Sequence, residues 1–159
     1  MVLCFISVLG ISRAMVDKYL RIDGINLDLK SDSKEEVIKE LYNLLDFNEI
    51  INGEECLDAI LCREAISSTG IGRGIAIPNA KSSSVLSTQV AMGVSKRGIN
   101  FGSIDFEDAK IFFLIVSPLR DKGINLSLVN KVAKMMRKEE IRNRILSAKK
   151  RNEIIGIIK

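Results

Sequence analysis

Histidine is absent from the 159 residues of this chain. Its absence excludes general acid–base catalysis by an imidazole, metal ligation by histidine and a phosphohistidine intermediate. Cysteine is scarce as well, because Cys4, Cys56 and Cys62 give neither an even disulfide framework nor the close pair of a zinc or dithiol site. We therefore expect reduced thiols in a cytoplasmic protein that binds no metal and needs no cofactor.

The sequence also lacks an apolar run long enough to span a membrane. Residues 1–11 are almost wholly apolar, but they are too few to cross a bilayer and carry no basic n-region or clear cleavage site. No stable membrane insertion is expected. Residues 1–16 fit either an apolar extension packed as an N-terminal helix or a start assigned too early, with Met15 as the true first residue. Residues 17–159 are expected to form one domain, since a chain of this length buries about 70% of its unfolded surface.

The charge of the chain is concentrated near its C-terminus. The formal net charge is +4, and the segment from Lys131 to Arg151 holds nine basic and two acidic residues, which leaves −3 for the rest. Clustered cations of this kind suit nucleic acid or an acidic partner. These charges interleave with apolar helix positions, however, and the segment has no aromatic residue on which a base can stack. A solvated helix face is the simpler interpretation, so no nucleic acid is expected as a partner and a nucleic-acid-binding domain is only the remote alternative.

Apolar periodicity predicts strands that alternate with helices. Residues 25–29 alternate as a half-buried strand does, and Ser33 with Glu36 forms a capping box that opens a helix. The unbroken apolar run 111–116 is typical of a central strand covered on both faces. Further strands are predicted over residues 75–77 and 90–94, and further helices around residues 57–64, 126–136, 141–148 and 153–158. This order favours an α/β fold with a single sheet and helices on both faces.

The helix after Pro118 has a specific predicted start and a specific predicted face. Asn125 is expected to be its N-cap, because asparagine is favoured there. Its buried side is expected to carry Leu126, Val129, Ala133 and Met136.

Residues 65–86 are rich in Ser, Thr and Gly and form the candidate functional loop. The glycine spacing matches neither a dinucleotide fingerprint nor a P-loop, and glycines this close together usually mark tight turns. With guanidinium groups and backbone amides, the segment is also suited to hold an anion. The predicted anion-binding loop consists of Thr69, Gly70, Gly72, Arg73 and Gly74.

The segment from Arg63 and Glu64 through Ser67 to Lys81 resembles the signature of enzyme IIA domains of the fructose, mannitol and nitrogen-regulatory class, in the phosphoenolpyruvate-dependent sugar phosphotransferase system. That signature ends in Gly-Ile-Ala-Ile-Pro-His-Ala, where this chain has Asn79 in place of the histidine. The resemblance covers about residues 17–159. It implies a mixed sheet of about five strands.

The resemblance also implies roles for three positions. Asn79 stands where the family has its phosphoacceptor histidine, Asn125 stands at the second histidine, and Arg63 matches an arginine that helps to hold the phosphoryl group. A carboxamide cannot form a transferable phosphoramidate, because the lone pair of its nitrogen is delocalised. The implied protein is an enzyme IIA homologue without phosphotransfer that serves as a regulatory or protein-interaction module. Its expected partners are the histidine phosphocarrier protein, an enzyme IIB-like protein or a regulated target.

Two alternatives stay open at this point. The chain is a working phosphoryl carrier if another residue accepts the group, for which Cys62 and the hydroxyls of Ser67 to Thr69 and Ser82 to Ser84 are candidates. The bland explanation for Asn79 is a turn residue after Pro78. For Arg63 it is a surface residue at a helix end.

Overall fold

The computed structural model describes residues 15–159, so the predictions for the N-terminal extension and for Cys4 lie outside the described residues. Within this range six strands form one mixed sheet. The strands are β1 (Leu20–Asn26), β2 (Gly70–Gly72), β3 (Ile75–Ala76), β4 (Asn79–Ser82), β5 (Gln89–Ile99) and β6 (Ala109–Pro118). The α-helices are α1 (Lys34–Tyr42), α2 (Gly53–Ile66), α3 (Ile124–Met136), α4 (Glu139–Ser147) and α5 (Arg151–Ile158).

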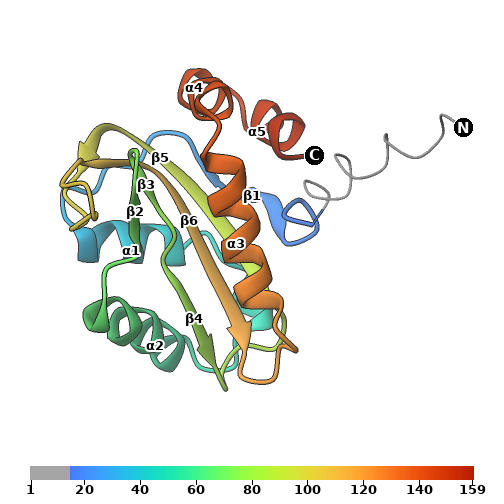
Figure 1. The fold of residues 1–159 in the computed structure, drawn as a ribbon. Coiled ribbons are helices and arrows are strands. Elements are labelled where there is room, and N and C mark those ends of the chain that lie inside the picture. Colours follow the sequence, from blue (N-terminus) through green and yellow to red (C-terminus); the bar gives the residue numbers. More distant parts are fainter. Residues whose placement is uncertain (1–14) are drawn as a thin grey trace, which may run out of the picture.

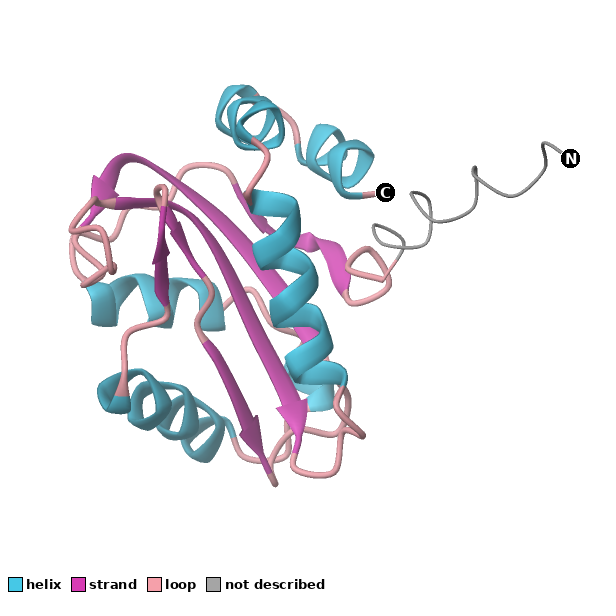
Figure 2. Cartoon of the chain, viewed as in Figure 1, coloured by secondary structure: helices cyan, strands magenta, loops and turns pink. Residues whose placement is uncertain are grey.

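The helices cover both faces of the sheet, as predicted (Figures 1 and 2). Central strand β6 shows why its sequence is apolar without alternation. Ile111, Phe113 and Ile115 pack into the core under α3, α4 and α5, whereas Phe112 and Leu114 pack into the core under α1 and α2. Each side chain of the run is therefore buried in one of two cores, which confirms the predicted central strand.

The strand order is β1-β5-β6-β3-β2, and β4 also pairs with β6. Strands β3 and β4 lie one after the other along the same edge of β6 and parallel to it, with Ile75 opposite Ile111 and Asn79 opposite Ile115. The sheet has one strand more than the expected number of about five. Strands β2 and β4 were not predicted, because both are short and neither contains an apolar run.

Two predicted element boundaries are wrong for local reasons. The first strand spans residues 20–26 and not 25–29, because the Asn26 side-chain oxygen accepts the Asp28 N–H at 3.0 Å and turns the chain there. Helix α1 begins after Ser33 as predicted, with the Ser33 hydroxyl accepting the Glu36 N–H at 3.3 Å. It ends at Tyr42, earlier than the apolar spacing indicated.

The predicted start of α3 is also wrong. Its N-cap is Gly123, at a φ of 84°, and Asn125 lies inside the first turn. The capping is done by Asp121, whose carboxylate accepts the N–H groups of Gly123 at 3.1 Å and Asn125 at 2.7 Å. The buried face is shifted accordingly, so Leu126 is 63% exposed while Asn125 and Leu128 are buried.

Among residues 15–159, no helix combines the length and the apolar character needed to cross a membrane.

Candidate functional site

Asn79 is the first residue of β4, which pairs with β6 along the same edge as β3. Pro78 has no N–H, so the ladder of β6 is interrupted there, but its carbonyl still accepts the Ile115 N–H at 2.9 Å. Asn79 is half-buried, and its side-chain Nδ2 donates to the carbonyl of Ile77 at 2.9 Å. This bond to the residue before Pro78 fixes the orientation of the Asn79 side chain.

Asn125 is held against the same strand from α3. Its buried Nδ2 donates to the carbonyl of Ala80 at 3.2 Å and to the hydroxyl of Ser117 at 3.1 Å. Ala80 directly follows Asn79, so Asn125 of α3 is bonded to the strand one residue beyond Asn79. Both hydrogens of the Asn125 amide are used within the protein, which satisfies a buried polar group.

A buried carboxylate holds this arrangement together. Asp121 accepts the two α3 amides and also pairs with the ammonium group of Lys81 at 2.9 Å. Burial raises the pKa of the Asp121 carboxyl, but the hydrogen bonds from Lys81 and from the two backbone amides outweigh it, so this pKa lies below its ordinary value. Asp121 thus stays ionised and links the end of β4 to the start of α3. Sequence reasoning missed this pair, since 40 residues separate its members and no local pattern joins them.

Arg63 lies in the last turn of α2, the helix that packs along β4. Helix α2 packs along β4, and near the start of α2 the Glu55 carboxylate accepts a hydrogen bond from the Ser83 hydroxyl. Arg63 is half-buried, and its guanidinium donates to the carbonyl of Ser67 at 3.0 Å. The predicted helix C-terminus for Arg63 is confirmed.

The predicted anion-binding loop is a tight hairpin, and it does not join the asparagines. Gly72, Arg73 and Gly74 all have positive φ values, of 87°, 57° and 75°. Gly72 is required there, because a Cβ would lie 2.9 Å from a carboxylate oxygen of Asp105. The same carboxylate already accepts the Arg73 N–H at 2.8 Å. The hairpin adjoins Ile75, which is four residues or about 13 Å along the strand from Asn79.

The remaining loop residues anchor α2. Thr69 donates both its N–H, at 2.9 Å, and its hydroxyl to the buried carboxylate of Glu64. Glu64 also pairs with the ammonium group of Lys34 at 2.6 Å, which lies 4.7 Å from the centre of the Phe101 ring. Gly70 is in close contact with Ser103, where a Cβ would lie 2.5 Å from the hydroxyl oxygen. The Lys34–Glu64 pair was not predicted, because its partners lie 30 residues apart.

Most of the hydroxyls proposed as alternative acceptors already have hydrogen-bond partners. Ser68 donates to the Phe101 carbonyl at 2.7 Å, and the Ser82 oxygen accepts the Ser84 N–H at 3.1 Å. Ser83 donates to Glu55, a carboxylate that can act as a base. That hydrogen bond, together with one from Ser84, lowers the pKa of the Glu55 carboxyl and makes it a weaker base.

Comparison with known proteins identifies one family that matches nearly all of the chain. Residues 18–159 match the family described as phosphoenolpyruvate-dependent sugar phosphotransferase system, EIIA 2. The fructose-specific EIIA component of Haloferax volcanii is 30% identical over 138 residues, which are 86% of this chain and 90% of that protein. The fructose-specific EIIABC component of Bacillus subtilis is 38% identical over 135 residues, which are 84% of this chain but only 21% of that protein.

Solved structures share the fold. The nitrogen regulatory protein IIA-Ntr of Neisseria meningitidis superposes with a TM-score of 0.85 at 23% identity, covering 91% of this chain and 99% of that one. The mannitol IIA of Escherichia coli, solved in complex with phosphorylated enzyme IIB, superposes with a TM-score of 0.75 at 21% identity, covering 87% of this chain and 97% of that one. The resemblance seen in the signature is thereby confirmed, and so is the fold class that it implied.

Proposed function

This chain belongs to the EIIA 2 family of the phosphoenolpyruvate-dependent sugar phosphotransferase system, and we propose that it is a member that cannot carry phosphate and acts by binding proteins. The observation that carries the proposal is a chain without histidine, in which Asn79 stands where the resemblance of the signature segment puts the acceptor. An amide nitrogen is a hydrogen-bond donor whose lone pair is delocalised, so it cannot attack phosphorus.

The hydrogen bond of Asn79 supports the proposal in atomic terms. The Nδ2 group occupies the donor position that the Nδ1–H of a histidine would take toward the Ile77 carbonyl. Such a bond selects the tautomer of an imidazole and leaves the other ring nitrogen free for attack. In Asn79 the orienting bond is made, but no second nitrogen extends beyond it. The local frame for a nucleophile is present without the nucleophile.

The consequence for binding is a surface of fixed charge. A phosphoryl group would add a charge of about −1.5 to −2 at neutral pH. Asn79 acquires no such charge, so proteins that bind around it meet the same surface at every phosphorylation level of the system. Candidate partners are the histidine phosphocarrier protein, an enzyme IIB component and a regulated target. A IIB component is the partner in the solved mannitol IIA complex.

The test is transfer of radiolabel from phosphoenolpyruvate through enzyme I and the histidine phosphocarrier protein. We expect no acid-labile label on the unmodified chain. Asn79→His is expected to gain label, because its Nδ1–H can bond Ile77 and its Nε2 is then free. Asn79→Gln is the matched control and should stay unlabelled. Label on the unmodified chain would refute the loss of transfer, and an unlabelled Asn79→His variant would refute the retained docking surface.

A second candidate function is a phosphoryl carrier with a different acceptor. The observation that favours it is the Ser83 hydroxyl bonded to Glu55, next to β4. A serine phosphate is a stable ester, which disfavours onward transfer. Acid-stable label on the unmodified chain that disappears in Ser83→Ala, with peptide mapping to residues 82–84, would establish this candidate.

A further inference from the structure

A groove of about 410 Å³ lies at the end of the sheet away from Asn125. Its walls come from the β2–β3 hairpin, the loop before β6 and the C-terminal end of α3. Met136 on this wall is 11 residues, or about 16 Å of helix, from Asn125. The groove is therefore separate from the site around the asparagines, and its chemistry does not depend on whether Asn79 carries phosphate.

The floor and one edge of the groove are apolar. Ile71, Ile75, Ile104, Ala133 and Met136 line it. Ile104 is 78% exposed, and Phe106 in the same loop is 97% exposed. Apolar side chains grouped in this way at a hollow mark an interaction site more often than single exposed ones do.

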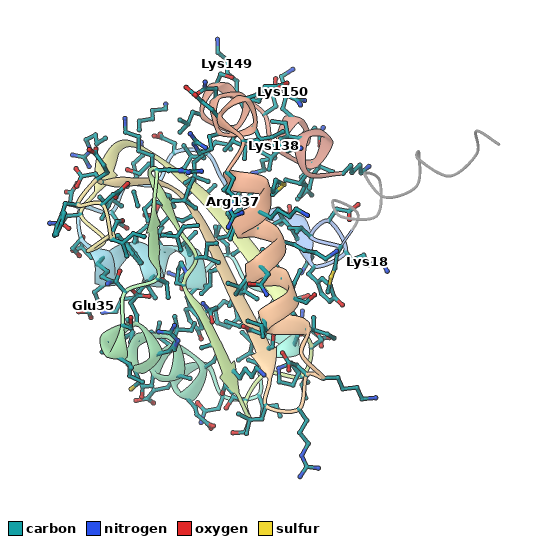
Figure 3. The ribbon with its side chains drawn as sticks, viewed as in Figure 1. Lys18, Glu35, Arg137, Lys138, Lys149 and Lys150 are labelled. Atoms are coloured by element: carbon teal, nitrogen blue, oxygen red, sulfur yellow. The ribbon has the colours of Figure 1, made fainter. Side chains whose placement is uncertain are left out.

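The rim of the groove is cationic. Arg73 and Arg137 line it from opposite walls, and Figure 3 shows Arg137 at the upper end of α3 with Lys138 above it. Within residues 15–159, neither guanidinium has a carboxylate within 4 Å. The acidic group in the groove is Asp105, whose oxygens accept the N–H groups of Arg73 and Glu107. Both oxygens of the Asp105 carboxylate therefore already have backbone hydrogen-bond donors.

The walls are held in place by specific contacts. Asp105 ties the loop to the hairpin, and Arg142 donates to the carbonyls of Met136 at 2.8 Å and Arg137 at 3.0 Å. Arg142 therefore satisfies C-terminal carbonyls of α3, and Arg73 also donates one N–H of its guanidinium to the Arg137 carbonyl at 3.5 Å, which leaves its other N–H groups for a ligand. Phe106 has a φ of 62°, which non-glycine residues rarely adopt, and this conformation turns the loop at the groove.

We propose that this groove binds an acidic peptide segment of a partner protein, with an apolar side chain on the floor and carboxylates on Arg73 and Arg137. A guanidinium pairs with a carboxylate through two parallel hydrogen bonds, which gives such a rim its selectivity. An apolar floor gives no contact to the phosphates of a nucleic acid, and a concave site does not match a flat bilayer surface. The chemistry of the groove therefore favours a peptide with both carboxylates and an apolar anchor.

The experiment uses the full chain labelled with ¹⁵N and four pools of ten-residue peptides. Two pools contain acidic residues, one together with apolar residues and the other with polar residues. The other two contain apolar residues, one together with basic residues and the other with neutral residues. We expect the acidic–apolar pool alone to shift the amide signals of residues 71–75, 103–106 and 133–137. Arg73→Ala with Arg137→Ala should weaken this binding about tenfold or more. Ile104→Ser should weaken it about tenfold, and since the side chain is exposed the fold is retained.

The matched control is Lys149→Ala with Lys150→Ala. Neither lysine lines the groove, and Figure 3 shows both above Arg137 and Lys138, beside the C-terminal helices, so this variant loses the same charge outside the groove. It should bind the acidic–apolar pool as the unmodified chain does. Equal loss in both double variants, equal binding of the acidic–polar pool, or no shift with any pool would overturn the proposal. Signals that shift with protein concentration alone would overturn it in favour of a second copy of the chain.

Discussion

Replacing Asp121 with asparagine is expected to destabilise the fold more than any other single-atom change at the sheet edge. The carboxylate is 5% exposed and accepts hydrogen bonds from two α3 amides and from Lys81. Asp121→Asn keeps the shape but turns one acceptor into an NH₂ donor that faces other donors. Hydrogen bonds to charged groups are worth about 1.5–3 kcal/mol each, so we expect the free energy of unfolding to fall by about 2–3 kcal/mol.

The assay is urea and thermal unfolding at pH 7. For a chain of this size, 2–3 kcal/mol corresponds to a fall in Tm of about 4–12 °C. Lys81→Met is the matched control, because it removes the other half of an ion pair whose lysine is 42% exposed. That variant should lose about 1 kcal/mol or less, since exposed pairs contribute little and Asp121 keeps its backbone donors.

The pH dependence gives an independent check with a definite sign. The pKa of Asp121 is lowered in the folded state, so its contribution is complete above the unfolded value, which is about 3.9, and is lost as the pH falls through the folded pKa. The difference between the unmodified chain and Asp121→Asn should therefore narrow on acidification. A difference below about 0.5 kcal/mol at pH 7, or one that stays constant down to acid pH, would refute this account of the cap.

Three further predictions concern single positions. Gly72→Ala should lower the free energy of unfolding by about 2 kcal/mol or more, because its Cβ would meet Asp105 and φ is 87°. Gly123→Ala, at a similar φ but in open space, should lower it by about 1 kcal/mol, and chemical denaturation of both variants measures the difference. Burial raises the pKa of the Cys56 thiol to about 11, so alkylation at pH 8 followed by peptide mapping should modify exposed Cys62 and spare Cys56 until the chain unfolds. Leu128→Ala should lower the free energy of unfolding by about 3 kcal/mol in a urea titration, since the side chain is fully buried; a loss below about 1 kcal/mol would contradict the α3 face described here.

Local signals account for the parts of the fold that sequence reasoning obtained. The Ser33 cap depends on a side chain and an amide three residues apart, and the run from Ile111 to Val116 needs only burial on both faces. The start of α3 was missed because two capping signals compete there. Asparagine is a common N-cap, but Asp121 accepts the amides of Gly123 and Asn125, and Gly123 takes the N-cap position.

The site was predicted in part, and by resemblance more than by pattern. Asn125 is bonded to Ala80, the residue after Asn79, and no periodicity in the chain indicates that contact. Glycine spacing suggested one loop for an anion. The structure separates that loop from the asparagines, because β3 and β4 run on along β6 and each residue of an extended strand adds about 3.3 Å.

Helix α3 is fastened at both of its ends by side chains from other parts of the chain. Asp121 closes its first turn, and Arg142 with Arg73 closes its last. A helix with both termini satisfied has no free end from which to fray. Its amide protons should therefore exchange with solvent only when the sheet beneath it opens. The amides of α3, from Asn125 to the groove, should then exchange together in one cooperative opening.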